Sequence, residues 1–185
     1  RGLAPALFPP GNRTRDRADD KHVLLCVSSI RTEKNLEDFF NLVYPKSRKI
    51  MVGDGPMREY YEEKYPDVEF VGFKTGTELA EYYANADVFV FPSKWETFGV
   101  VMIEAMACGT PVAAYPVTGP IDVLGNSKAG AMNDDLREAC LQALKIPREV
   151  ARAHAEKFSW KAASEQFALH LKPVPSPEVH ITALA

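Results

Sequence analysis

The sequence lacks the features that would place it in several special classes of protein. Its 185 residues contain no apolar run approaching the roughly 18 residues that a membrane-spanning helix needs, and no secretory signal. Basic residues are not in excess either, because 22 Lys and Arg residues stand against 25 Asp and Glu residues, for a formal net charge of -3. Proteins that bind nucleic acid by neutralising phosphates need a basic surface, so this balance argues against such a function.

Cysteine and histidine are also scarce. Cys26, Cys108 and Cys140 are far apart, lie in apolar contexts and match no metal-binding or redox spacing. We interpret all three as buried small hydrophobic residues of a protein in a reducing, cytoplasmic compartment. The four His residues show no metal-ligand spacing. We therefore expect neither a bound metal nor a bound cofactor.

What is present is typical of a soluble globular domain, with 46% hydrophobic and 25% charged residues. Residues 1–21 are rich in Pro and in charge, and we interpret them as a linker-like leading segment. Residues 22–172 are predicted to form the folded domain. Residues 173–185 contain further Pro residues and are interpreted as a tail.

Short apolar runs alternate with amphipathic stretches along the predicted domain. The runs lack strict alternation, which is typical of strands buried on both faces, and they cover residues 23–27, 49–52, 68–72, 88–91, 111–114 and 129–132. The stretches between and after them predict helices at 36–43, 57–65, 78–84, 100–108, 135–144, 149–157 and 160–170, with Thr77 capping the third and Gly109 ending the fourth. This order predicts an α/β fold, a doubly wound parallel, Rossmann-like sheet of about six strands.

Such sheets bind ligands at the carboxyl ends of their strands, where the strand order reverses. One segment that leaves a predicted strand, residues 91–114, reads FPSKWETFGVVMIEAMACGTPVAA. Its helix is apolar almost all round and is therefore predicted to be buried, yet it contains Glu104. A buried carboxylate needs hydrogen-bond donors. Two readings remain open: an internal Arg or Lys, or a ligand with hydroxyl groups.

The start of the same helix predicts an anion site. The backbone N–H groups of Phe98, Gly99 and Val100 are free at a helix amino end, and the Gly allows close approach to the backbone. An anion there and a hydroxyl-bearing group beside Glu104 would suit a nucleoside diphosphate. Glu96 could then contact a second polyol beyond the phosphates.

Seven residues separate Glu96 from Glu104, and the segment resembles the signature of the retaining nucleotide-sugar glycosyltransferase family 4, which has the GT-B fold. The similarity extends over most of the chain. VGDGP at 52–56, VEFVGF at 68–73 and ELAEYYANADVFVFPS at 78–93 resemble successive units of the family's carboxyl-terminal, donor-binding domain. RGLAPALFPP at 1–10 resembles its interdomain linker. The resemblance implies that the chain is one half of a GT-B enzyme.

The resemblance also implies roles for single residues. Glu104 would bind the ribose of the donor, Glu96 the sugar hydroxyls near the reacting carbon, and Lys34 the diphosphate. The implied catalytic residues are Glu96 and Lys34. The implied donor-binding residues are Ser29, Arg31, Lys34, Gly53, Gly72, Phe73, Glu96, Thr97, Phe98, Gly99, Val100 and Glu104. We interpret the Gly53 loop as a turn that lines the cleft and not as a NAD site.

Three positions depart from the family pattern. Ser28 and Ser29 stand where the family usually has Gly-Arg, whose Arg grips the diphosphate; Arg31 is a candidate to replace it. Loss of that Arg would cost roughly 1.5–3 kcal/mol of charge-assisted contact. Thr97 replaces a common Gly. The family's Gly-Gly-x-x-Glu segment is absent, and residues 118–122 read TGPID.

The implied function is transfer of a hexose from a UDP-, GDP- or ADP-type donor to a hydroxyl acceptor, with retention. The nucleotide sugar is a substrate, and the implied partner is a missing amino-terminal acceptor domain. Many family members use lipid acceptors, so peripheral membrane contact of the full enzyme stays open. Two alternatives also stay open: a non-catalytic nucleotide-sugar-binding module, and a sugar-nucleotide epimerase of the same fold.

Overall fold

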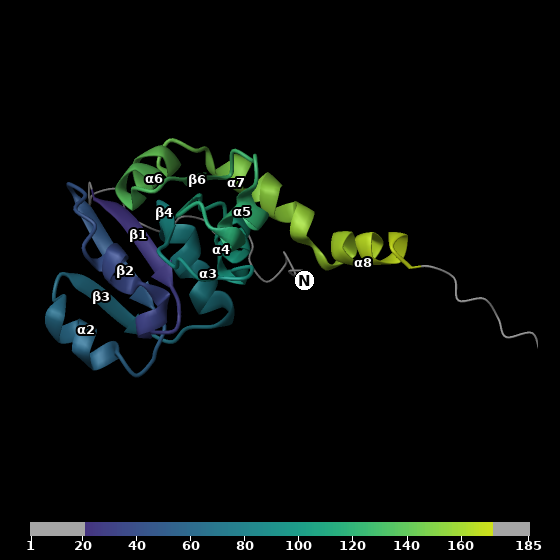
Figure 1. The fold of residues 1–185 in the computed structure, drawn as a ribbon. Coiled ribbons are helices and arrows are strands. Elements are labelled where there is room, and N and C mark those ends of the chain that lie inside the picture. The colour runs from purple at the N-terminus through teal and green to yellow at the C-terminus, as the bar shows by residue number, and fades with distance from the viewer. Residues whose placement is uncertain (1–20, 172–185) are drawn as a thin grey trace, which may run out of the picture.

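The computed structural model describes residues 21–171, so the predicted leading segment, apart from its last residue, and the predicted tail lie outside the described residues. Its centre is a six-stranded sheet in the order β3-β2-β1-β4-β5-β6, in which every pair is parallel (Figure 1). The strands are β1 His22–Val27, β2 Ser47–Val52, β3 Val68–Gly72, β4 Val88–Phe91, β5 Val112–Ala114 and β6 Gly130–Met132. The predicted doubly wound α/β fold is confirmed.

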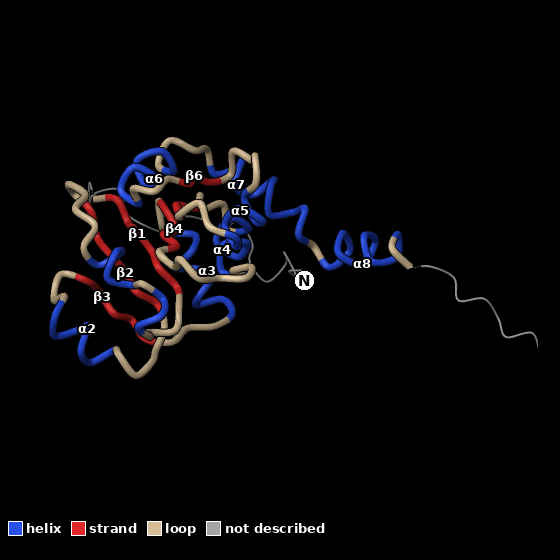
Figure 2. Tube along the Cα trace, viewed as in Figure 1, coloured by secondary structure: helices blue, strands red, loops and turns tan. Residues whose placement is uncertain are grey.

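Helices cover both faces of the sheet (Figure 2). One face packs against α1 Leu36–Phe40, α2 Arg58–Lys64 and α6 Leu136–Ala143. The other packs against α3 Gly76–Asn85, α4 Val100–Ala107, α5 Thr118–Leu124 and α7 Arg148–Ala155. The remaining helix, α8 Trp160–Leu169, follows the short 3-10 helix η3 Glu156–Phe158 and extends away from the sheet.

Successive residues of the central strands enter opposite cores, which is why their apolar runs are continuous. In β1, Val23 and Leu25 belong to the core under α3 and α4, whereas Leu24 and Cys26 belong to the core under α1 and α6. Strand β4 behaves in the same way and is buried along its whole length. A strand with helices on both sides has no solvent face and needs no polar residues.

The predicted helices are all present, with corrected ends. The first ends at Phe40 instead of residue 43, with Asn41 as its C-cap. The third begins at Gly76 with Thr75 as its N-cap, so the predicted cap at Thr77 was wrong. Gly109 ends the fourth in left-handed backbone, with φ 82°, as predicted.

Helix α5 was not predicted at all. Its sequence, TGPIDVL, has Gly and Pro as its second and third residues, and this pair usually indicates a turn. The Pro lies in the first turn, where its missing N–H leaves no helical hydrogen bond unmade. The buried residues Val123 and Leu124 attach α5 to the core under α4.

The Arg148 side chain holds the ends of two helices on this face. Its guanidinium donates to the carbonyl oxygens of Ala84 and Ala86 at 2.8 Å each, and to that of Cys108 at 3.0 Å. A further bond of 3.0 Å reaches the hydroxyl oxygen of the fully buried Thr110. The last carbonyl groups of a helix have no partner within the helix, so Arg148 satisfies acceptors that α3 and α4 leave open.

Within residues 21–171, none of the helices combines enough length and apolar character to cross a membrane.

We predict that Arg148→Met lowers the free energy of unfolding by about 2–4 kcal/mol, because several acceptors lose their donor together. Arg137→Met is the matched control, since Arg137 is exposed and its carbonyl bond is also exposed. Its effect should stay within about 0.5 kcal/mol. Urea denaturation measures both variants. Equal stability of the two would show that the Arg148 bonds do not stabilise the fold.

Candidate functional site

A cavity of about 230 Å³ opens where the strand order reverses, between β1 and β4. Its walls come from the segments that leave these two strands and from the start of α4. The predicted site residues among its lining are Ser29, Lys34, Glu96, Gly99 and Val100. Sequence positions more than 60 residues apart therefore meet at the edge of the sheet where α/β folds bind ligands.

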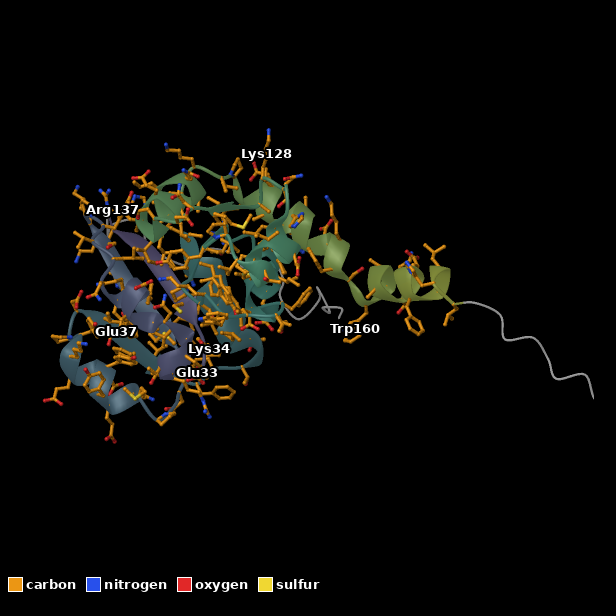
Figure 3. All side chains as sticks on the ribbon, in the orientation of Figure 1. Glu33, Lys34, Glu37, Lys128, Arg137 and Trp160 are labelled. Atoms are coloured by element: carbon orange, nitrogen blue, oxygen red, sulfur yellow. The ribbon has the colours of Figure 1, made fainter. Side chains whose placement is uncertain are left out.

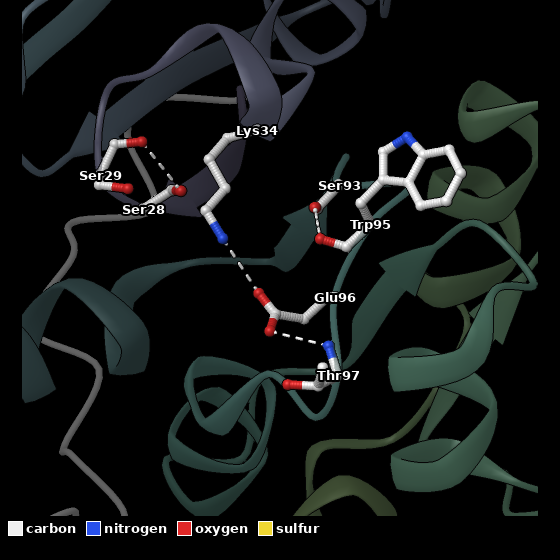
Figure 4. Close-up of polar contacts among 7 residues, drawn as sticks. All are labelled: Ser28, Ser29, Lys34, Ser93, Trp95, Glu96 and Thr97. Atoms are coloured by element: carbon white, nitrogen blue, oxygen red, sulfur yellow. Dashed lines mark hydrogen bonds and ion pairs between the residues drawn. The ribbon is translucent and has the colours of Figure 1, made fainter.

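Lys34 and Glu96 form an ion pair across this cavity. The Lys34 Nζ atom lies 3.1 Å from Glu96 Oε2, and the two side chains are 28% and 22% exposed (Figure 4). Lys34 ends the 3-10 helix η2 Thr32–Lys34 in the segment after β1, while Glu96 lies in the loop between β4 and α4. The pair thus bridges two neighbouring strand exits.

The Glu96 carboxylate also reaches the backbone just before α4. Its Oε1 atom accepts a hydrogen bond of 3.0 Å from the Thr97 N–H. Partial burial opposes ionisation of Glu96, but the bonds from Lys34 and from backbone N–H groups outweigh it, so the pKa of Glu96 lies below its usual value. Glu96 therefore stays anionic, and its carboxylate lies next to Lys34 and the start of α4, where a bound anion was predicted.

Gly99 sets the direction of α4 at the cavity wall. It is the N-cap of α4 and has left-handed backbone, with φ 76°. A Cβ atom at this position would lie 2.6 Å from the Met102 Cε atom, so only Gly fits without displacement. Thr97 and Phe98, also predicted to bind the donor, do not line the cavity; Thr97 is exposed and Phe98 packs near Phe158, with 6.3 Å between ring centroids.

Among the described residues, Glu104 lacks the internal Arg or Lys partner of the first reading, and the ligand reading stays a prediction. It is only partly buried, and its Oε2 atom accepts a hydrogen bond of 2.9 Å from the hydroxyl of the fully buried Tyr83. Within residues 21–171 this neutral hydroxyl is its hydrogen-bond donor, instead of an Arg or Lys. Burial raises the pKa of Glu104, and the bond from Tyr83 offsets only part of that effect. Glu104 does not line the cavity between β1 and β4.

Four other predicted donor-binding residues also lie outside this cavity. Gly53 allows a close backbone contact. A Cβ atom there would lie 1.9 Å from the Ser28 carbonyl oxygen, so the segments after β1 and β2 touch through their backbones. Gly72 is left-handed and faces Arg58, and Phe73 is 73% exposed. Arg31 is exposed, and its replacement of the family's Arg at the diphosphate stays a prediction.

A cluster around Asp38 holds the site together, and the sequence did not predict it. The Asp38 Oδ2 atom accepts bonds of 2.6 Å from Asn35 and from the Tyr115 hydroxyl, and lies 3.0 Å from Lys94 Nζ. Asn35 also donates to the Pro92 carbonyl oxygen at 2.9 Å. These contacts join the segments after β1, β4 and β5.

The cluster positions the two charged residues of the cavity through their neighbours in sequence. Asn35 directly follows Lys34, and Lys94 lies two residues before Glu96. Partial burial opposes ionisation of Asp38, but bonds from Tyr115, Asn35 and Lys94 outweigh it, so the pKa of Asp38 is lowered. One signal in the sequence was available: Asn35, in left-handed backbone between η2 and α1, is a residue type that favours such turns.

The three cysteines are buried and free, as predicted. Burial raises the pKa of Cys108 and of Cys140 to about 12. In residues 21–171 no group of three or more His, Cys, Asp or Glu side chains is arranged to hold a metal ion.

Comparisons with known proteins identify a family for most of the chain. A model of the family described as Glycosyl transferases group 1 matches residues 21–146. The chain is 34% identical over 163 residues to a sulfoquinovosyl transferase of Arabidopsis thaliana, covering 78% of the chain and 32% of that protein. It is 34% identical over 141 residues to a GDP-mannose-dependent alpha-mannosyltransferase of Corynebacterium glutamicum, covering 72% and 34%. The chain thus spans about a third of the length of these relatives.

Solved structures of similar fold extend over nearly the whole chain. Sucrose-phosphate synthase from Thermosynechococcus elongatus matches with a TM-score of 0.76 and 28% identity, over 91% of this chain and 50% of that one. Anabaena HepE in complex with UDP and glucose matches with a TM-score of 0.74 and 21% identity, over 91% and 54%. The second likeness supports the fold alone.

We predict that Asp38→Asn makes the free energy of unfolding depend less on pH in the acid range. The pKa of Asp38 is lower in the folded protein, so its stabilising effect is present above the ordinary carboxyl pKa of about 3.9 and is lost as pH falls through the folded-state value. The difference in unfolding free energy between wild type and Asp38→Asn should therefore be largest near neutral pH and shrink in acid. Urea denaturation at several pH values measures it.

The control for Asp38 is Glu63→Gln, a change at an exposed carboxylate on α2 that has no hydrogen-bond or ion-pair partner among residues 21–171. It should alter stability little at any of these pH values. A constant difference between wild type and Asp38→Asn across the acid range would contradict the role given to the Asp38 charge.

Proposed function

The chain belongs to the group 1 glycosyl transferases, and we propose that it is the donor-binding half of an enzyme that transfers a hexose from a nucleotide sugar to a hydroxyl, with retention. The observation that carries the proposal is the ion pair of Lys34 and Glu96 at the reversal of strand order. It brings a cation for a diphosphate next to a carboxylate for sugar hydroxyls.

Relatives support the choice of donor class. The Corynebacterium protein is named as GDP-mannose-dependent, and the Anabaena structure contains UDP and glucose. The Lys34 ammonium group and the backbone N–H groups near Gly99 are the groups of this chain that would contact the phosphates. Glu104, fixed by the Tyr83 hydroxyl, is proposed to accept bonds from the ribose.

The proposed reaction breaks the bond between the anomeric carbon and the leaving phosphate oxygen. The acceptor oxygen forms its bond to the same carbon on the same face, and its proton passes to the departing phosphate. The task of this chain is to stabilise the charge that develops on the diphosphate, and preorganised cations and amides do so without reorganisation at the moment of reaction. Glu96 would orient the sugar by its hydroxyl groups.

The chain spans about a third of the length of the curated relatives and half of sucrose-phosphate synthase. The acceptor domain is proposed to correspond to a part of these proteins that this chain does not cover. A cytoplasmic enzyme with peripheral membrane contact is part of the same proposal.

A second candidate function is a nucleotide-sugar-binding module without transfer. Ser28 and Ser29 line the cavity where the family resemblance implies an Arg, and Arg31 does not line it. Nucleotide binding without hydrolysis or transfer, after the amino-terminal half of the natural protein is supplied, would favour the module.

We predict that Lys34→Ala raises the dissociation constant for a nucleoside diphosphate about tenfold or more, since a charge-assisted phosphate contact is lost. The remaining binding should also depend less on salt. Calorimetry with UDP, GDP and ADP at two salt concentrations measures both effects.

The control for Lys34 is Lys128→Ala, because Lys128 is exposed and lies across the domain from Lys34 (Figure 3). It should leave affinity unchanged. If none of the three nucleotides binds wild type, the proposed function fails.

We predict that Glu96→Gln changes the affinity for two ligands by different amounts. Removing the carboxylate frees Lys34 and removes its repulsion of phosphate, so a bare nucleoside diphosphate should bind several-fold more tightly. The nucleotide sugar should gain less, because its hydroxyl groups lose an ionised acceptor. Calorimetry with UDP against UDP-glucose, or GDP against GDP-mannose, gives the ratio. Glu33→Gln, a nearby exposed carboxylate, is the control. Weaker binding of the bare diphosphate would contradict the role given to Glu96.

A further inference from the structure

A second pocket lies beside the cavity between β1 and β4, and the proposed function does not use it. Its volume is about 690 Å³. The segments that leave β4, β5 and β6 form its walls, so it continues along the same edge of the sheet. Glu96 lines both pockets and is the boundary between them.

The lining of this second pocket includes exposed apolar side chains. Trp95 lines it and is 84% exposed, and Ile121 of α5 lines it at 47% exposure. Figure 4 shows that the indole of Trp95 points away from Lys34. A large apolar ring left in water at the border of a polar site commonly marks a surface that contacts a ligand.

The segment that carries this indole is held in place by an ion pair and a cation–π contact of Lys94. Lys94 lies 3.0 Å from Asp38 and 4.7 Å from the centre of the Tyr115 ring, so the segment before Trp95 is tied to the end of β5. Thr118 and Asp134 add a hydroxyl and a carboxylate to the lining. Within residues 21–171 neither side chain has a hydrogen-bond partner, so both are free to bind a ligand.

These features suit a sugar ring. A pyranose has a face of C–H groups, which stacks on an aromatic ring, and an edge of hydroxyl groups, which needs donors and acceptors such as Thr118 and Asp134. We propose that this pocket binds the terminal sugar of a glycosyl acceptor, with Trp95 as its stacking platform. The proposal rests on the proposed function of the neighbouring cavity.

The position of Glu96 favours the acceptor over the donor as the occupant. In the proposed function the diphosphate lies at Lys34 and the transferred sugar at Glu96. The second pocket shares Glu96 with the first, lacks Lys34 in its lining, and includes residues of the segments after β5 and β6. A sugar bound there leaves the nucleotide in place, and for retention its attacking hydroxyl must reach the face of the transferred sugar that carries the leaving phosphate.

The two tryptophans of the sequence make this proposal testable by fluorescence in the full chain. Trp160→Phe leaves Trp95 as the single indole, and Trp95→Phe leaves Trp160, which is 60% exposed, as the matched control. The probes are methyl α-glucopyranoside and methyl α-mannopyranoside. We expect a saturable change of Trp95 emission with one of them and none for Trp160. Saturation-transfer NMR should give Trp95→Ala an affinity at least about tenfold lower, with Trp95→Phe in between.

Three results would overturn the proposal. One is the lack of a saturable response of Trp95 to either glycoside. Another is displacement of the glycoside by UDP-glucose or GDP-mannose, which would give the pocket to the donor sugar. The third is a response to phosphatidylcholine vesicles and not to glycosides, which would give the surface to lipid. Calorimetry with nucleotides in the same samples separates the two ideas: glycoside binding without nucleotide binding defeats the proposed function and leaves the sugar surface standing.

Discussion

The structure of the site depends on one carboxylate, Glu96, which is held between the ammonium group of Lys34 and a backbone N–H group just before α4. Glu96 accepts from Lys34 on one side and from the Thr97 N–H on the other. Because these partners belong to the segments after β1 and before α4, the single side chain fixes the distance between two strand exits. The same carboxylate lines both pockets along the sheet edge. The proposed phosphate site and the proposed sugar sites therefore adjoin each other. A phosphate that binds Lys34 must compete with the Glu96 carboxylate for its ammonium group.

The loops around Glu96 are held by polar bonds and by close backbone contact more than by apolar packing. Asp38 gathers Asn35, Tyr115 and Lys94 into one cluster, and Gly53 lets the segment after β2 lie directly on Ser28. The two apolar cores lie beneath, on the two faces of the sheet. This division lets the edge loops carry charged residues without loss of core packing.

Much of the fold could be predicted because burial leaves a pattern in the chain. The apolar strands, Gly109 as a helix end and the buried cysteines follow from hydrophobic runs and local backbone preference. Helix α5 could not be predicted, because Gly and Pro indicate a turn when only neighbouring residues are considered. Its helical form is stabilised by the packing of Val123 and Leu124 in the core under α4. The Lys34 and Glu96 pair was within reach through a family resemblance, whereas Asp38 carried no signal of its own.

By itself, the sequence determined the alternation of strand and helix, and with it the edge of the sheet where polar loops gather. It also named five of the residues that line the cavity between β1 and β4. Only the tertiary structure decided their partners: Tyr83 for Glu104, Asp38 for Lys94, and Arg148 for the ends of two helices. The physical reason is range. Hydrophobic periodicity acts over a few neighbouring residues, while a hydrogen bond between distant segments depends on how the whole sheet brings their ends together.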